Sequence, residues 1–348
     1  MKQVILDDSL EAAELYPFTR TRHVAEIRVG ILTIREKWEL MLGTRVHISS
    51  DKRNSTDADT IIVPANIIPT KNFVQDVLQK GAVPEQLPED VLVLKYPWQI
   101  FQFNDKAIRA DFEMLKSDRI SQPLPETVQV IQVSNVFVEE GAKLSHCMLN
   151  GSTGPIYIGK NAEIMEGTYI RGPFALGEGA VIKMASRIYG ATTIGPFCVA
   201  GGEIKNSVML GYSNKAHDGY MGDSVIGEWC NLGAGTSNSN LKNTAGEIKT
   251  WNAITNKFNP AGQKCGVLMG DYSRAAINTS FNTGTVVGVC CNVFGGGLTE
   301  KFIPDFSWGN GKYEFEKAVK DIANWKKMKN HSLTDDEIQK LKTIFDEL

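Results

Sequence analysis

The chain lacks an excess of charge of either sign, a long apolar run and paired cysteines. Its 348 residues carry a formal charge of -3, which does not favour nucleic acid or another polyanion as a partner. No apolar stretch is long enough to span a bilayer, and Asp7-Asp8 interrupts the apolar start that a secretory leader would need. The six cysteines form no CxxC pair, which predicts small apolar fillers in a reducing compartment rather than a metal site or a disulfide framework. We therefore expect a cytoplasmic protein without membrane insertion.

What the sequence has instead is an apolar residue at every sixth position through much of its second half. An α-helix would repeat at 3.6 residues and an alternating strand at two, so a repeat of six predicts a left-handed parallel β-helix of hexapeptide type. Each hexad points one apolar side chain inward, and only stacking of successive coils buries it. The positions are Ile158, Ile164, Ile170, Leu176, Ile182, Ile188, Ile194 and Ala200, then Ile226 and Leu232, then Met269, Ala275, Phe281, Val287 and Val293.

Residues 1–125 have a different pattern, in which short apolar strands alternate with helical periodicity. Strands are expected at 4–6, 60–63 and 91–94. Helices are expected at 24–42, ending at Gly43, at 72–81, and at 105–116 with Asn104 as the N-cap. This order predicts a small α/β domain, followed by a linker at Pro123-Leu124-Pro125.

The β-helix is expected to occupy residues 126–310, with two irregularities. The six-residue register slips between 201 and 220, and residues 241–266 form an insertion without the repeat. Insertions on such stacks often lie on the binding face, so this one is a candidate cover for a site. Residues 311–348 read as two amphipathic helices that close the open end of the β-helix.

His217 is the first candidate for chemistry. It lies in the irregular polar segment beside Lys215 and Asp218, away from any apolar stripe. A neutral imidazole suits general-base work near neutral pH, and loops held by a rigid scaffold often carry catalytic groups. A surface histidine without a role is the alternative.

A resemblance covers residues 127–300 and is strongest from 187 to 240. The sequences Glu203-Ile204-Lys205-Asn206-Ser207, Asn214 through Asp223, and Asn231-Leu232-Gly233-Ala234-Gly235-Thr236 resemble the acyltransferase half of a known enzyme family. This is the bacterial bifunctional N-acetylglucosamine-1-phosphate uridylyltransferase/glucosamine-1-phosphate N-acetyltransferase family. The resemblance implies a homotrimer with acetyl-CoA held in a cleft between adjacent β-helices, and a phosphorylated or nucleotide-linked amino sugar as acceptor.

The resemblance also implies roles for individual residues. His217 falls at the base that takes the proton from the sugar amine, and Glu203 at a carboxylate that orients it. Arg187 and Lys205 fall at cations that hold the sugar phosphate. Further polar contacts to the sugar or the reacting centre fall at Tyr220, Asn231 and Asn240. Backbone N–H groups of Gly233, Ala234 and Gly235 are candidates for contacts to the acyl donor and the oxyanion. Each residue alone also has an ordinary structural explanation.

The N-terminal domain resembles only part of a sugar-nucleotide pyrophosphorylase. The sequence from Leu15 to Arg22 is similar to the segment after the glycine-rich loop of those enzymes, yet the acidic residues Asp7 and Asp8 stand where that loop would bind triphosphate. Asp7, Asp8, Arg20 and Arg22 are therefore expected to support the fold, and Mg²⁺ would be used only if nucleotidyl transfer occurs. The alternatives to acyl transfer are a sugar-1-phosphate nucleotidyltransferase and a non-catalytic scaffold that binds sugar nucleotides.

Overall fold

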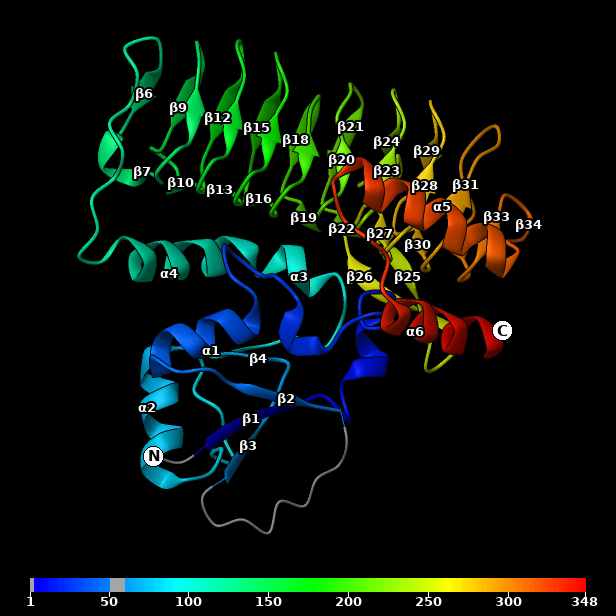
Figure 1. The fold of residues 1–348 in the computed structure, drawn as a ribbon, viewed down its shortest axis with the longest axis horizontal. Coiled ribbons are helices and arrows are strands. Elements are labelled where there is room, and N and C mark those ends of the chain that lie inside the picture. Colours follow the sequence, from blue (N-terminus) through cyan, green and yellow to red (C-terminus); the bar gives the residue numbers. More distant parts are fainter. Residues whose placement is uncertain (1–2, 51–59) are drawn as a thin grey trace.

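The computed structural model describes residues 3–50 and 60–348. A small α/β domain precedes a parallel β-helix, and two helices follow it (Figure 1). This is the architecture that the sequence predicts, including the left-handed parallel β-helix.

The β-helix has three faces of parallel strands in the described part of the chain. Face 1 consists of β7 (Val136–Val138), β10 (Ile156–Ile158), β13 (Phe174–Leu176), β16 (Thr192–Ile194), β19 (Val208–Gly211), β22 (Val225–Glu228), β27 (Leu268–Met269), β30 (Val286–Val287) and β32 (Phe302–Ile303). Face 2 consists of β8 (Lys143–Leu144), β11 (Glu163–Ile164), β14 (Val181–Ile182), β17 (Val199–Ala200), β20 (Asn214–Lys215), β23 (Asn231–Leu232), β28 (Arg274–Ala275), β31 (Asn292–Val293) and β33 (Ser307–Trp308), with β34 (Gly311–Lys312) antiparallel at its end. Face 3 consists of β6 (Gln129–Ile131), β9 (Met148–Asn150), β12 (Tyr169–Arg171), β15 (Arg187–Tyr189), β18 (Glu203–Lys205) and β21 (Tyr220–Gly222), after which β24 (Ser237–Asn238) pairs with β29 (Ser280–Phe281). The 3-10 turn η3 (Val133–Asn135) lies between β6 and β7.

All fifteen hexad residues named above are buried in one cluster inside the prism, so that prediction is confirmed. Regular coils are eighteen residues long, as the pairing of Ile158 with Leu176 shows. The six cysteines are buried and unpaired with one another, as the sequence predicts.

The register slip is a change in coil length. Val199 pairs with Asn214, which is fifteen residues later, and Asn214 pairs with Asn231, which is seventeen residues later. The chain therefore reaches face 3 early, through the tight corner Gly201-Gly202, where Gly202 has a φ of 77°. A Cβ at Gly202 would lie 2.9 Å from the carbonyl oxygen of His217, so this close stacking requires glycine.

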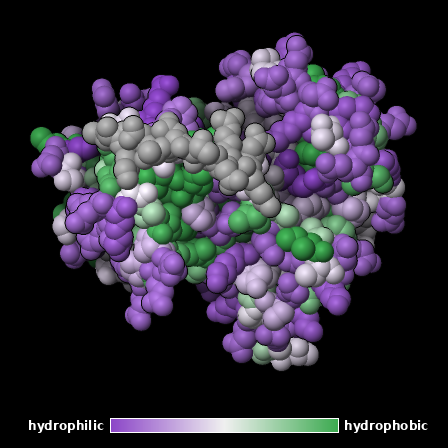
Figure 2. Space-filling view, turned by 90° about the horizontal axis from the view of Figure 1, so that it is seen from below, coloured by the Kyte–Doolittle hydropathy of each residue, from purple (hydrophilic) through white to green (hydrophobic). Residues whose placement is uncertain are grey.

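The N-terminal domain is built on the parallel sheet β2-β1-β3, comprising β2 (His47–Ser49), β1 (Gln3–Asp7) and β3 (Thr60–Pro64). The hairpin β4 (Ile67–Ile68) and β5 (Leu92–Val93), the turns η1 (Ala12–Leu15) and η2 (Val24–Glu26), and the helices α1 (Ile34–Leu42), α2 (Lys71–Lys80), α3 (Gln99–Gln102) and α4 (Asn104–Lys116) complete it. From below, this side of the molecule is mostly hydrophilic, with hydrophobic side chains gathered near its centre (Figure 2).

Two of the predicted helix starts are wrong. The first helix begins at Ile34 rather than at residue 24, because Thr33 and Glu36 form a capping box that starts it. Asn104 does not cap α4. Its side chain accepts from the Gly30 amide at 2.8 Å and donates to the Ala191 carbonyl at 2.8 Å, which ties the domain to face 1.

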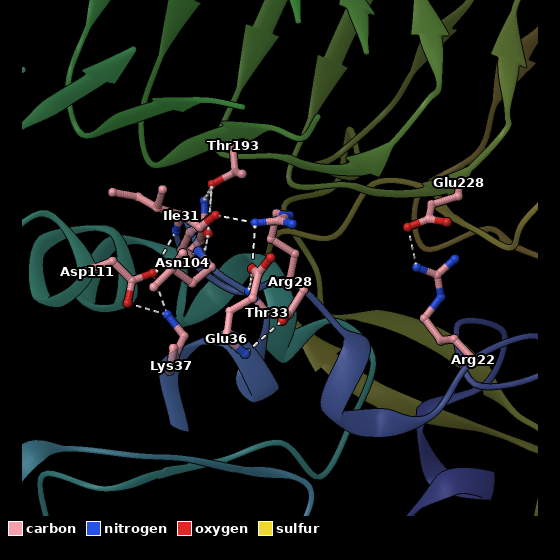
Figure 3. A network of polar contacts seen from close by, with 12 residues as sticks. Arg22, Arg28, Ile31, Thr33, Glu36, Lys37, Asn104, Asp111, Thr193 and Glu228 are labelled. Atoms are coloured by element: carbon pink, nitrogen blue, oxygen red, sulfur yellow. Dashed lines mark hydrogen bonds and ion pairs between the residues drawn. The ribbon is translucent and has the colours of Figure 1, made fainter. Parts of the chain in front are cut away.

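A buried ion pair lies beside this contact (Figure 3). The Lys37 ammonium binds the Asp111 carboxylate, and their side chains are 2% and 1% exposed. Asp111 also accepts hydrogen bonds from the amides of Ile31 and Leu32 at 2.8 and 3.1 Å. These bonds hold residues 30–32 in a bend between the paired residues Arg28 and Thr33 and keep them out of the predicted helix.

The segment that resembles a pyrophosphorylase binds the β-helix. Arg20 pairs with Asp305 at 3.0 Å, and Arg22 pairs with Asp271 and, at 3.0 Å, with Glu228 (Figure 3 shows the Arg22–Glu228 pair). These side chains support the fold, as expected. Both guanidinium groups are therefore bound by carboxylates of the β-helix.

The insertion at 241–266 also serves this interface. It forms the hairpin β25 (Ile248–Asn252) and β26 (Lys257–Gly262), and its Ile248 and Ala261 belong to the hydrophobic core of the N-terminal domain. Asn252 donates to the Glu14 carboxylate at 3.2 Å. The expectation that this insertion covers a site on the β-helix is therefore wrong, because the hairpin is packed between the two domains (Figure 1).

The C-terminal helices α5 (Phe315–Met328) and α6 (Asp335–Asp346) pack along the β-helix instead of closing its end, as Figure 1 shows for α5. Aromatic residues at successive corners explain this position. Tyr212 stacks between Phe197 and Trp229, with ring centroids 5.2 and 4.4 Å away, and His331 contacts Trp229 edge-on. In the described ranges, no helix is both long and apolar enough to cross a membrane.

Candidate active site

His217 lies at the corner where the chain turns from face 2 to face 3. Its side chain is exposed, and its backbone is held from inside the prism by Lys215. The Lys215 ammonium donates to the carbonyl of His217 at 2.6 Å and to that of Gly201 at 3.3 Å. Lys215 is only 2% exposed at an interior position, and burial lowers its pKa to about 8. The corner that carries His217 is thus anchored by a buried lysine.

Four of the predicted site residues line one cavity of about 540 Å³, namely His217, Asn231, Gly233 and Ala234. Its other walls come from neighbouring coils and from α5: Val199, Asn214, Ala216, Leu232, Ile277, Trp325, Met328 and Lys329. Among the described residues of this lining, Lys329 is the one ionisable residue apart from His217, and none is a carboxylate. The cavity is therefore suited to a ligand that combines apolar and anionic parts.

The corner after Asn231 offers fewer backbone donors than the sequence suggests. The Gly233 amide donates to the Ala275 carbonyl at 2.9 Å, and the Gly235 amide donates to that of Asp218 at 3.0 Å. Across the described residues, the Ala234 amide takes part in no hydrogen bond. Ala234 is therefore the one member of this trio whose N–H is available to a ligand.

A second group of predicted residues lies on face 3. Arg187, Glu203 and Tyr220 occupy one row on three successive strands, and Lys205 lies one row over, beside Tyr189. Tyr189 donates to Glu203 at 2.7 Å, and Arg187 approaches the same carboxylate at 3.8 Å. The Lys205 ammonium lies 5.9 Å from the centre of the Tyr189 ring.

Glu203 and His217 are not joined. Within residues 3–50 and 60–348, no hydrogen bond or ion pair links them, since Tyr189 and Arg187 bind the carboxylate. The orienting role of Glu203 stays a prediction.

Tyr220 and Asn240 are brought together at the edge of face 3. The Asn240 amide donates to the Tyr220 hydroxyl at 3.1 Å and also to the Asp223 carboxylate. Asn206 donates to the other oxygen of Asp223 at 2.6 Å. Burial and the Asp223 charge raise the pKa of Tyr220 to about 12, so it remains a hydrogen-bond donor.

Sequence reasoning missed several of these neighbours. Asn206 and Asp223 are seventeen residues apart, close to one coil, and that spacing was the signal that their side chains stack. Asn214 lines the cavity and pairs in register with Asn231. Nothing in the sequence indicates that Trp325 and Lys329 line the cavity, because helix periodicity does not show where α5 packs.

The chain spans between 37% and 60% of the length of two curated relatives. A bifunctional sugar-1-phosphate nucleotidylyltransferase/acetyltransferase of Sulfurisphaera tokodaii is 33% identical over 154 residues, covering 42% of this chain and 37% of that protein. The bifunctional protein GlmU of Methanocaldococcus jannaschii is 25% identical over 301 residues, covering 83% of this chain and 60% of that protein.

Solved structures give weaker matches. The polySia-specific acetyltransferase NeuO is 12% identical with a TM-score of 0.25, covering 51% of this chain and 79% of that one. A perosamine N-acetyltransferase from Caulobacter crescentus, solved with CoA and GDP-perosamine, is 9% identical with a TM-score of 0.17. The match covers 88% of this chain and 91% of that one. At these TM-scores neither similarity bears on function.

The N-terminal domain matches a family model of its own. The model described as sugar nucleotidyl transferase matches residues 3–85 and 77–120. Together with the curated relatives, this match supports the resemblance of the chain to bifunctional sugar-1-phosphate nucleotidylyltransferase/acetyltransferase proteins of the GlmU-like family.

Proposed function

We propose that the protein is an enzyme that transfers an acetyl group from acetyl-CoA to the amine of a phosphorylated or nucleotide-linked amino sugar. One observation carries this proposal. His217 and the later residues Asn231, Gly233 and Ala234, which the resemblance picks out, line a single cavity to which no carboxylate of the described residues contributes. The names of the two curated relatives, one of which includes acetyltransferase, support the same class of reaction.

The chemistry follows from what this cavity holds. The His217 imidazole takes a proton from the attacking ammonium or amine, because a neutral imidazole is the base available near pH 7. The nitrogen then attacks the thioester carbonyl, and the Ala234 amide is placed to donate to the oxyanion that develops. Collapse of this intermediate breaks the C–S bond and forms the amide, and the His217 imidazolium returns its proton to the departing sulfur, so that the donor leaves as a free thiol.

The acceptor's phosphate would be held on face 3. Arg187 and Lys205 are cations on neighbouring strands, and the Tyr220 hydroxyl adds a neutral donor beside them. Asn240 uses both of its N–H groups on Tyr220 and Asp223, and so it positions the tyrosine. In one chain these side chains lie around the corner from the His217 cavity. A homotrimer would place face 3 of one chain beside this cavity in another, and we propose that assembly.

The N-terminal domain contributes differently in this proposal. Arg20 and Arg22 are bound by carboxylates of the β-helix, and the first strand ends in Asp7-Asp8. We therefore infer that the domain positions the β-helix without transferring nucleotides, and that Mg²⁺ is not required for the reaction.

The test follows free thiol after mixing the protein with acetyl-CoA and glucosamine 1-phosphate, and follows pyrophosphate separately with sugar 1-phosphate and each nucleoside triphosphate. Wild type should release thiol, His217→Ala should not, and His146→Ala, which alters an exposed histidine elsewhere on the β-helix, should match wild type. Pyrophosphate release alone would indicate a nucleotidyltransferase. Release of neither thiol nor pyrophosphate across a panel of amino sugars would indicate a non-catalytic scaffold.

A further inference from the structure

Arg274 is a buried arginine whose charge is not balanced by an ion pair. It is 7% exposed on face 2, and its Nε and Nη2 atoms are buried without a hydrogen-bond partner. In the described part of the chain no carboxylate lies within ion-pair distance of its guanidinium. Asp321 on α5 is the nearby acid, and it accepts a hydrogen bond from Tyr313.

Isolated buried charges are costly, and burial accordingly lowers the pKa of Arg274. An arginine carries five N–H donors in a planar fork that matches phosphate and carboxylate oxygens. The one partner of the Arg274 side chain in the described residues is the Trp325 ring, whose centre lies 5.5 Å from the guanidinium carbon.

The position of Arg274 connects it to the His217 cavity. It is the register partner of Asn231, which lines that cavity, and neighbouring strands lie about 4.8 Å apart. Trp325 both lines the cavity and covers Arg274. A shift of the Trp325 side chain would therefore bring the guanidinium into the cavity wall, where Lys329 already supplies positive charge.

We propose that Arg274 binds an anionic oxygen group of the acyl donor that occupies the His217 cavity, with Trp325 moving aside as the donor enters. This inference rests on the acyl transfer proposed above. The anion is either a phosphate of the CoA moiety or a carboxylate at the end of the acyl chain, and the unpaired donors of Arg274 fit both.

The experiment compares wild type with Arg274→Met and Arg274→Lys by calorimetric titration with CoA, pantetheine, acetyl-CoA and succinyl-CoA. Arg109→Met, which removes an exposed arginine of α4, is the matched control. If the phosphates are bound, Arg274→Met should weaken the three CoA ligands about tenfold or more and leave pantetheine unchanged. If the acyl carboxylate is bound, only succinyl-CoA should weaken. In either case Arg274→Lys should recover part of the loss.

Thermal unfolding without ligand separates binding from a structural role. Because Arg274→Met removes an uncompensated charge, its melting temperature should equal or exceed that of wild type. Equal affinities of wild type and Arg274→Met for all four ligands would overturn the inference, as would a uniform loss that includes pantetheine and accompanies a lower melting temperature.

Should wild type bind none of the four, the acyl-transfer proposal itself fails. Arg274 is then judged by thermal shift with inorganic pyrophosphate and with succinate. Stabilisation of wild type but not of Arg274→Met supports an anion site, and no stabilisation overturns it.

Discussion

Replacing Lys215 with methionine should change how stability depends on pH. Lys215 lies inside the β-helix, where the preceding coil has Ala200, and burial lowers its pKa from 10.5 to about 8. Between these values the unfolded chain binds the proton more tightly than the folded protein does. Stability should therefore rise with pH across this window and should be constant below it, where both states are protonated.

The magnitude follows from the two pKa values. The full difference between 10.5 and about 8 corresponds to about 3 kcal/mol, of which about 2 kcal/mol falls between pH 7 and pH 9.5. Other groups titrate in the same range, but they contribute alike to wild type and to Lys215→Met. The free energy of unfolding of wild type, minus that of the variant, should thus increase by about 2 kcal/mol over this interval.

Urea unfolding of both proteins at half-unit pH steps measures this difference. Lys160→Met, which removes an exposed lysine of the β-helix, should run parallel to wild type. A curve of unfolding free energy against pH for Lys215→Met that also runs parallel to that of wild type would mean that Lys215 is not buried as a charged group. The claim that it anchors the His217 corner from inside the β-helix would then be refuted.

Four further predictions concern the interior, the domain interface, the acceptor site and assembly. Asp111→Asn should lower the unfolding free energy by about 3–5 kcal/mol in urea titrations, because it leaves a buried lysine unpaired, whereas the exposed Asp105→Asn on the same helix should stay within about 1 kcal/mol. Arg22→Met should speed hydrogen exchange in β1 while sparing the strands of face 3, since it removes both ion pairs of a side chain that is 7% exposed; unchanged exchange would show that the interface does not depend on it. Lys205→Met should raise the KM for glucosamine 1-phosphate about tenfold with little change in kcat, as expected for loss of a binding contact, and a fall in kcat alone would contradict that role. Light scattering should give three times the chain mass of 38.3 kDa, and a monomer that is fully active would refute the shared site.

The fold of the β-helix was predictable because its signal is local and repeated. Each hexad residue from Ile158 onward stacks on the equivalent residue of the next coil, so the pattern survives without knowledge of distant contacts. The end of α2 at Gly81 was predictable for the same reason, since a left-handed C-cap is a local requirement.

The errors came from contacts between segments far apart in the chain. Asp111 binds amides near residue 31 and so delays the start of α1, and Asn104 is used by face 1 instead of capping α4. The hairpin after β24 packs against the N-terminal domain, which no local pattern in residues 241–266 reveals.

The candidate site was predictable only in part. Resemblance located His217, Asn231 and the Gly233 corner, whereas the wall formed by α5 depends on where that helix docks. The unpaired state of Arg274 could not be foreseen either, because a sequence does not show which charges lack partners.

The most direct test of the central claim is a crystal structure with CoA bound. The proposed chemistry predicts that the thiol end of CoA lies in the cavity bordered by His217 and Ala234, with the sulfur about 4 Å from the His217 imidazole. CoA bound elsewhere, with its thiol remote from His217 in every chain of the assembly, would contradict the claim that this corner of the β-helix is the catalytic site.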